Sequence, residues 1–374
     1  MNILIAGDYC PRGRIQKIIE SGDYQRIFGE LNEVVSQVDY SIVNLECPIT
    51  TGREEPIKKC GPNLQCSERG MDALKWAGFQ CVTLSNNHFY DYGEDGVEQT
   101  LRTCEKYGIE YVGGGHNIDE ASKILYKRIG NQTLAIINCC EHEFSVATEI
   151  SGGSNPLNQI QQYYNIQNAK TKADYVIVIV HGGHEHWQYP SPRMVETYRF
   201  FVDAGADAVV NHHQHCFSGY EEYQGKPIFY GLGNFCFDSP IRRQGNWTEG
   251  YMVSLQLDTV ITYKIIPYQQ CTEDELGVYL LPLNIYDSKL KKINSILVDK
   301  QQLKKETEKY YLTTSESYGN VLEPFNSYVF RALRRRRLLP SLISNTRFLQ
   351  AYNQVLCESH RDKFVWWLKT RIKK

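Results

Sequence analysis

Short apolar runs alternate, up to about residue 270, with stretches whose apolar positions repeat at helical spacing. A further pair of runs, Tyr251–Leu257 and Val260–Ile266, predicts a hairpin across a tight turn. Strands that alternate with helices are typical of a layered α/β fold. The earlier runs predict strands at Asn2–Ala6, Asp39–Asn44, Gln80–Leu84, Leu134–Asn138, Asp174–Val180, Ala208–Asn211 and Ile228–Tyr230. The helical spacing predicts helices at Ile15–Gln37, Glu68–Trp76, Gly96–Tyr107 and Pro192–Ala204.

The composition changes after residue 270. Polar residues, Tyr and Lys dominate up to Pro324, and two helical patterns follow, separated by Pro340. The second pattern repeats its apolar residues at roughly helical spacing: Phe348, Leu349, Tyr352, Val355, Leu356, Phe364, Trp367 and Leu368. We therefore predict one domain over residues 1–270 and a helical, basic C-terminal extension over residues 271–374.

Clusters of polar side chains follow five of the predicted strands. They are Gly7-Asp8, Asn44-Leu45-Glu46, Asn86-Asn87-His88 with Asp91, His181-Gly182-Gly183-His184-Glu185-His186, and Asn211-His212-His213-Gln214-His215. Ligands bind open α/β sheets beyond the carboxyl ends of the strands, so these clusters can converge on one crevice. Seven of the ten histidines lie in three of the clusters, which histidines scattered over a surface would not do.

Each cluster alone has an ordinary structural explanation. Asp8 can cap a helix, and Asn44 and Glu46 can hold the turn before Pro48. The Asn-Asn-His segment can be a hydrogen-bonded turn. The His-His-Gln-His run is harder to explain in this way, because neutral imidazoles held close together are costly unless something binds them.

The ligand types indicate the chemistry that such a crevice could perform. Carboxylate, amide oxygen and imidazole together suit Mn, Fe or Zn better than Mg or Ca, and they leave room for one or two ions. Two divalent metals clamp the attacking and leaving oxygens of a phosphoester. A histidine outside the metal ligands can protonate the leaving oxygen when a carboxylate orients it, and His88 with Asp91 is the best pair for that role.

The cysteines and the start of the chain bear on location. The twelve cysteines form no CxxC pair, so most are interpreted as small buried residues in a reducing compartment. The apolar start reaches Asp8 too soon for a signal peptide, and no apolar run is long enough for a transmembrane helix. We expect a cytoplasmic protein, with peripheral contact at the inner face of the membrane as an option.

The polar clusters and the sequence around them resemble the CapA capsule-synthesis family, also called the PgsA-like or poly-γ-glutamate synthesis family. The resemblance runs from residue 1 to about residue 268, and its most specific segments are Leu84-Ser85-Asn86-Asn87-His88 and the stretch from Gly225-Lys226-Pro227 to Gly233-Asn234-Phe235. It implies a relationship to calcineurin-like metallophosphoesterases and a four-layer α/β/β/α sandwich.

The resemblance also implies roles for individual residues. The candidate metal ligands are Asp8, Glu46, Asn87, His181, His212 and His215. His88 would be the leaving-group acid, oriented by Asp91, and Glu185 a group near the metal or the substrate. Arg14 and Asn234 would contact a substrate anion, although Arg14 can equally be a surface charge and Asn234 a turn residue.

The chain departs from the family pattern at several positions. Relatives among the phosphoesterases usually carry a histidine two residues after the first aspartate, where this chain has Cys10. A thiolate can bind zinc, but we expect Cys10 to be a small buried filler. Gln214 stands where the family prefers proline, and Gly182 replaces a frequent tryptophan. We also expect no membrane anchor of the kind that is usual in the family.

The basic tail has its own alternatives. Residues 331–374 hold twelve Lys and Arg against two acidic residues, although the whole chain has a net charge of only −2. The run Arg334-Arg335-Arg336-Arg337 with Trp366-Trp367 favours contact with an anionic membrane surface. The alternative is a helix that packs its aromatic residues on the core. An acidic polymer would also suit the charge, whereas no nucleic-acid-reading module accompanies it.

The leading interpretation is a metal-dependent hydrolase, of a phosphoester in the first place, that serves capsule or exopolysaccharide biosynthesis. One alternative is a non-catalytic capsule-assembly protein that binds an anionic polymer or a synthase partner. Another is metal-assisted amide hydrolysis or transfer on a polyglutamyl chain, because the same activation of water serves a carbonyl.

Overall fold

The computed structural model describes residues 1–315, 322–325, 327–336, 338–340 and 342–372. The chain divides into two compact units, Met1–Lys304 and Lys305–Lys374. The first unit extends past the boundary expected at residue 270. This is because Leu290 and Ile293 of helix α9 (Asp287–Val298) are buried in its hydrophobic core.

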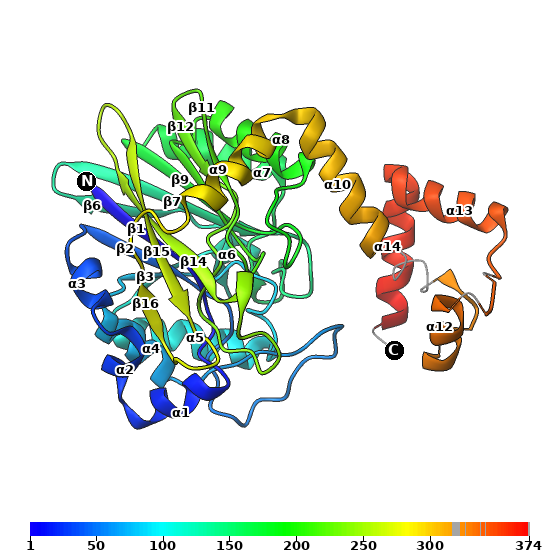
Figure 1. Cartoon of the computed structure of the whole chain (residues 1–374), viewed down its shortest axis with the longest axis horizontal. Coiled ribbons are helices and arrows are strands. Elements are labelled where there is room, and N and C mark those ends of the chain that lie inside the picture. The colour runs from blue at the N-terminus through cyan, green and yellow to red at the C-terminus, as the bar shows by residue number, and fades with distance from the viewer. Residues whose placement is uncertain (316–321, 326, 337, 341, 373–374) are drawn as a thin grey trace. The chain divides into compact units, whose positions relative to one another are not determined.

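Two sheets form the centre of the first unit (Figure 1). The eight-stranded sheet has the order β16-β15-β14-β1-β2-β3-β4, with β13 paired in parallel to β1. Its strands are β1 (Asn2–Tyr9), β2 (Tyr40–Leu45), β3 (Cys81–Thr83), β4 (Glu110–Val112), β13 (Asn234–Cys236), β14 (Glu249–Gln256), β15 (Thr262–Gln270) and β16 (Val278–Leu280). The predicted hairpin corresponds to β14 and β15, which pair antiparallel.

The six-stranded sheet has the order β11-β12-β10-β9-β7-β6. Its four inner strands run parallel to one another, and the two edge strands run antiparallel to their neighbours. Its strands are β6 (Leu125–Ile129), β7 (Gln132–Cys140), β9 (Tyr175–His181), β10 (Ala208–His212), β11 (Tyr220–Tyr223) and β12 (Lys226–Phe229). A two-stranded pair, β5 (Gly114–Gly115) with β8 (Gly153–Ser154), lies apart from both sheets.

Three buried clusters define the layers. Alternate residues of a strand face opposite sides of its sheet, so Ile3 and Ile5 of β1 meet Ile177 and Ile179 of β9 between the two sheets. The intervening Leu4 and Ala6 face the helices that cover the first sheet, and Val176 and Val178 face those that cover the second. This arrangement confirms the predicted four-layer α/β/β/α sandwich, and it explains why the inner strands are apolar throughout.

The helices of the outer layers are seen on opposite sides of the two sheets (Figure 1). The first sheet is covered by α1 (Arg14–Ser21), α2 (Tyr24–Phe28), α3 (Leu31–Ser36), α4 (Arg69–Ala77) and α5 (Gly93–Tyr107). The second is covered by α7 (Gln159–Lys170) and α8 (Pro192–Asp203), and the short α6 (Ile118–Ala121) adjoins β5 and β8. The single helix predicted over Ile15–Gln37 was wrong, because Gly22 and Gly29 take positive φ angles of 78° and 49° and end α1 and α2.

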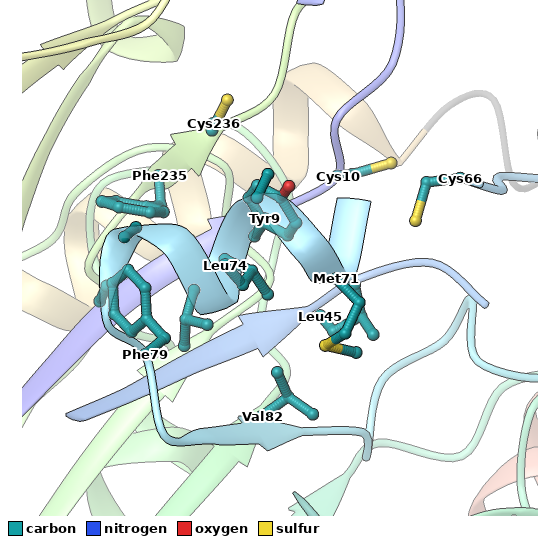
Figure 2. Packing of buried hydrophobic residues seen from close by; sticks show 14 of the residues in the cluster. Tyr9, Cys10, Leu45, Cys66, Met71, Leu74, Phe79, Val82, Phe235 and Cys236 are labelled. Carbon is teal, nitrogen blue, oxygen red and sulfur yellow. The ribbon is translucent and has the colours of Figure 1, made fainter. Parts of the chain in front are cut away.

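The packing on the outer side of the first sheet centres on Tyr9 (Figure 2). Met71 and Leu74 of α4 lie over Tyr9 and Leu45 at the ends of β1 and β2. The Tyr9 hydroxyl donates a hydrogen bond of 2.8 Å to the carbonyl of Gly70 at the start of that helix. Cys10 is fully buried in the same cluster, where the sequence predicted a filler residue.

The second unit is helical in its described part. It contains α12 (Tyr328–Arg335), α13 (Asn345–Leu356) and α14 (Glu358–Ile372), and α10 (Lys300–Thr314) spans its beginning. The helical pattern after Pro340 divides into two helices because Cys357 is extended. Arg337, which belongs to the predicted basic run, lies outside the described residues. In the part of the chain that the structure describes, a helix of the length and apolar character needed to cross a membrane is not found.

Candidate metal centre

A β-bulge turns Asp8 toward the space between the sheets. In the parallel pairing of β1 with β2, Ala6 lies opposite Val43 and Asp8 lies opposite Asn44, so Gly7 is an extra residue. Without this bulge Asp8 would share the helix-covered face of Ala6. A side chain at position 7 would not fit, because a Cβ there would lie 2.0 Å from the carbonyl oxygen of Gly233.

Asp8 reaches groups from both sheets. Asn44 donates from Nδ2 to Asp8 Oδ1 at 2.8 Å, and the backbone N–H of His213 donates to Oδ2 at 3.2 Å. His212 Nδ1 lies 3.4 Å from Asp8 Oδ1. Burial by itself raises the pKa of Asp8, but the neighbouring histidines outweigh it and lower that pKa overall. The carboxylate is therefore charged and available as a ligand.

Glu46 is the most informative residue of the cluster. It follows β2, is fully buried, and neither of its carboxylate oxygens has a hydrogen-bond partner in the described structure. Its Oε1 lies 3.5 Å from His215 Nε2 and 3.8 Å from His181 Nε2. Burial raises the pKa of Glu46 well above its ordinary value, and the charge of Asp8 raises it further. A buried carboxylate without hydrogen bonds is costly unless a cation neutralises it.

The histidines come from the second sheet. His181 and His212 end β9 and β10, and both keep the strand alternation that directs Ile179 and Val210 toward the first sheet. Asn87 Oδ1 lies 3.0 Å from His181 Nε2, and Asn44 Nδ2 lies 3.3 Å from His181 Nδ1. Neither ring nitrogen of His212 makes a hydrogen bond to a described residue.

His213 and His215 hold strained backbone conformations. Their φ angles are 91° and 56°, in the left-handed region that costs a residue other than glycine about 1–3 kcal/mol. His213 Nδ1 lies 3.0 Å from His181 Nε2, so His213 belongs to the cluster although it was not among the predicted ligands. Its place in the His-His-Gln-His run was the available signal. Burial lowers the pKa of His181 well below its usual value and that of His215 to about 4, so both rings are neutral at neutral pH.

These residues fit a divalent metal. Among the described residues, the ligand atoms of Glu46, His181 and His213 lie within 4.8 Å of one another, and so do those of Asp8, Glu46 and His215. The orphaned oxygens of Glu46 and ring nitrogens of His212 supply lone pairs that the protein itself does not satisfy. Neutral imidazoles with carboxylates form the mixed nitrogen and oxygen donor set expected for Mn, Fe or Zn. Cys10 belongs to neither three-residue group.

His88 lies beside this cluster with a partner pair of its own. Asp91 Oδ2 lies 2.7 Å from His88 Nδ1 and also accepts a hydrogen bond of 2.7 Å from the backbone N–H of Leu64. Lys59, from the loop after β2, contacts the other Asp91 oxygen, and its Nζ lies 3.1 Å from His88 Nδ1. The Lys59 side chain is only 3% exposed, and the sequence patterns gave no reason to select it.

The remaining predicted residues lie around the centre in different ways. Asn234 Oδ1 lies 2.9 Å from His215 Nδ1, so this amide orients a candidate ligand. Glu185 is half-exposed, and its contact with His186 lowers its pKa to about 2. Arg14 forms an ion pair of 2.8 Å with Asp238 and donates to carbonyls of residues 271–273. Its predicted contact with a substrate anion stays a prediction, and it would require these bonds to be exchanged.

Comparison with known proteins identifies the family. The family model described as bacterial capsule synthesis protein PGA_cap matches residues 2–239. The chain belongs to this family. The predicted resemblance is thereby confirmed, and the matched residues include every candidate ligand of the centre.

Two curated proteins and one solved structure are similar to this chain. The capsule biosynthesis protein CapA of Bacillus anthracis is 28% identical over 90% of this chain and 80% of its own length. The PGA biosynthesis protein CapA of Bacillus subtilis is 31% identical over 62% of each chain. A crystal structure of a hypothetical protein from Thermus thermophilus superposes with a TM-score of 0.48 and 16% identity, covering 75% of this chain and all of the other.

Proposed function

We propose that this member of the capsule synthesis family is a metal-dependent hydrolase, in the first place of a phosphoester, that acts on a capsule polymer or its precursor. The observation that carries the proposal is Glu46, whose buried carboxylate oxygens have no partner among the described residues and face the His181 and His215 rings. The groups that would hold the metal are Asp8, Glu46, Asn87, His181, His212, His213 and His215.

A bound divalent metal supplies Lewis-acid activation of a water and of an ester oxygen. The chain's own contribution is proton transfer by His88. Asp91 fixes the imidazole through Nδ1, and Nε2 makes no hydrogen bond to a described residue, so that nitrogen can give a proton to a leaving oxygen. Lys59 pairs with Asp91 and keeps that carboxylate in place.

The proposal is tested with three purified proteins: wild type, the double variant Asp8→Ala/His212→Ala, and His88→Gln. Elemental analysis should find one or two equivalents of Mn, Fe or Zn in wild type, a loss in the double variant and unchanged content in His88→Gln. A screen of phosphomonoesters, phosphodiesters and a γ-glutamyl amide should give turnover that falls at least 100-fold in His88→Gln. Wild type that binds no metal after reconstitution, or His88→Gln with full turnover, would contradict the proposal.

The competing function is a non-catalytic assembly protein, and the second unit favours it. Large apolar side chains are exposed on its described helices, with Tyr328 at 79%, Leu349 at 68% and Trp366 at 68%. The same segment carries the excess of Lys and Arg found in residues 331–374. A basic surface with exposed aromatic residues suits an anionic membrane or an anionic polymer.

This competing function has a separate test in the full chain. Binding to vesicles with and without phosphatidylglycerol, and to a polyglutamate, is compared with binding by a chain that lacks residues 331–374. A full-length variant of exposed residues, Arg331→Gln/Arg335→Gln/Arg336→Gln, separates charge from apolar contact. Unchanged vesicle and polymer binding in both altered chains would exclude the tail as the binding surface.

A further inference from the structure

A cavity of about 440 Å³ opens beside the candidate metal centre. His215 lines this cavity and also belongs to the Asp8–Glu46–His215 group, so the two sites share a side chain. Most of the other lining comes from the segment between β13 and β14, which includes Arg242, Arg243 and Trp247. The cavity and the candidate centre therefore adjoin at His215.

One wall of the cavity is aromatic. The Trp247 ring lies 5.0 Å from the His215 ring and 5.5 Å from the His186 ring, measured between centroids. Its indole N–H donates to the carbonyl of Phe237 at 3.1 Å, and the side chain is largely buried. The wall is therefore fixed in place and offers a flat face next to a candidate ligand.

The two arginines that line the cavity differ in their ion pairs. Arg243 Nε lies 3.3 Å from Asp238 Oδ1, and its Nη1 lies 3.4 Å from Glu273 Oε1. Arg242 has no carboxylate within ion-pair distance among the described residues. Its guanidinium carbon lies 5.4 Å from the Trp247 ring centroid, and its Nη1 contacts His186 Nε2. Arg242 is thus an exposed cation that lines the cavity and is held over an aromatic face.

We propose that this cavity binds an anionic group of the substrate, a carboxylate or a phosphate, through Arg242 and the Trp247 wall. The inference rests on the proposed function and deepens it, because it defines the substrate as one that carries a second negative charge next to the reacting bond. A guanidinium recognises both anions through paired N–H donors, which a lysine cannot reproduce. A polymer with repeating acidic units satisfies this requirement at every repeat.

The test measures anion binding directly through the fluorescence of Trp247, with inorganic phosphate and glutarate as separate probes. Titrations use the full chain as purified and again after chelation, so that anions bound to a metal are distinguished from anions in the cavity. Trp247→Phe identifies the reporter signal. Arg242→Gln and Arg242→Lys are compared with Arg102→Gln, a control on α5 whose side chain is 71% exposed.

We expect Arg242→Gln to weaken binding at least tenfold with and without chelation, Arg242→Lys to weaken it less, and Arg102→Gln to leave it unchanged. Preference for phosphate or for glutarate assigns the anion. Equal affinity in wild type and Arg242→Gln, or no binding of either probe by wild type, would overturn the proposal. Arg242-dependent binding in a protein without metal or turnover would leave the anion site in place and contradict only the hydrolase.

Discussion

Replacing Glu46 with glutamine is expected to remove the effect of a chelator on stability. In wild type, a metal held by Asp8, Glu46 and the histidines binds only the folded chain and so raises the free energy of unfolding. In Glu46→Gln, the amide supplies a weaker ligand and no charge, so metal content falls. The same substitution removes a buried carboxylate whose oxygens have no hydrogen bonds among the described residues, and that removal favours the metal-free fold.

The size of the effect follows from the size of the unit that carries the centre. At a free metal concentration 100-fold above Kd, binding contributes about 2.7 kcal/mol. An unfolding entropy of ~2.1 cal/mol/K per residue over Met1–Lys304 gives about 0.6 kcal/mol/K. Chelation should therefore lower the Tm of wild type by about 4 °C. The Tm of chelated wild type should be no higher than the Tm of Glu46→Gln. The Tm of metal-loaded wild type should be higher than both.

The assay is differential scanning fluorimetry with and without EDTA, together with elemental analysis of each sample. Glu98→Gln is the matched control, since that side chain is 51% exposed on α5 and distant in sequence from every candidate ligand. It should behave as wild type. If Glu46→Gln kept both the metal content and the EDTA-sensitive Tm of wild type, the interpretation of the orphaned carboxylate would be wrong.

Three further predictions concern the neighbours of the centre. Burial lowers the pKa of His215 to about 4 from about 6.5, so the free energy of unfolding of the chelated protein should fall by about 3 kcal/mol between pH 6.5 and pH 4. Urea unfolding of His215→Gln should lack this loss, and equal pH slopes in the two proteins would contradict the prediction. Asn234→Ala should weaken metal binding about 10–100-fold, whereas Asn234→Asp keeps an acceptor for His215. Competition with a fluorescent chelator measures the metal affinity of both variants, and equal affinities in wild type and Asn234→Ala would exclude an orienting role. Lys59→Met should lower the free energy of unfolding in urea by about 3 kcal/mol, because Asp91 stays buried without its cation, and adding Asp91→Asn should recover part of this loss. A loss below about 0.5 kcal/mol would contradict the role of the buried pair.

The convergence of side chains could be predicted where strand alternation alone directs them. His181 and His212 continue the period of two that their strands already show, so their convergence could be predicted. The position of Asp8 depends on a bulge at Gly7, which reverses the face of the strand residues that follow it. The apolar pattern does not show where this extra residue lies. Asp8 was selected for its place after a strand, and the structural reason is different.

The residues that the sequence missed lie in loops. Lys59 reaches the His88–Asp91 pair from a long irregular segment, where spacing carries no information about contacts. His213, which was not among the predicted ligands, takes a backbone angle that local propensity disfavours, and the fold imposes it. The short edge strand β16 has only three residues, which is too few for a periodic signal.

The centre draws Asp8 and Glu46 from one sheet and its histidines from the other, so it is also a contact between two halves of the sandwich. The buried core between the sheets is largely apolar, and apolar contacts tolerate small sliding motions better than directed ligands do. The amount of metal bound at the centre would therefore depend on how the two sheets are aligned. A measurement of helix content would not detect a change in that alignment. Separation of the sheets would disassemble the centre while each sheet kept its own hydrogen bonds.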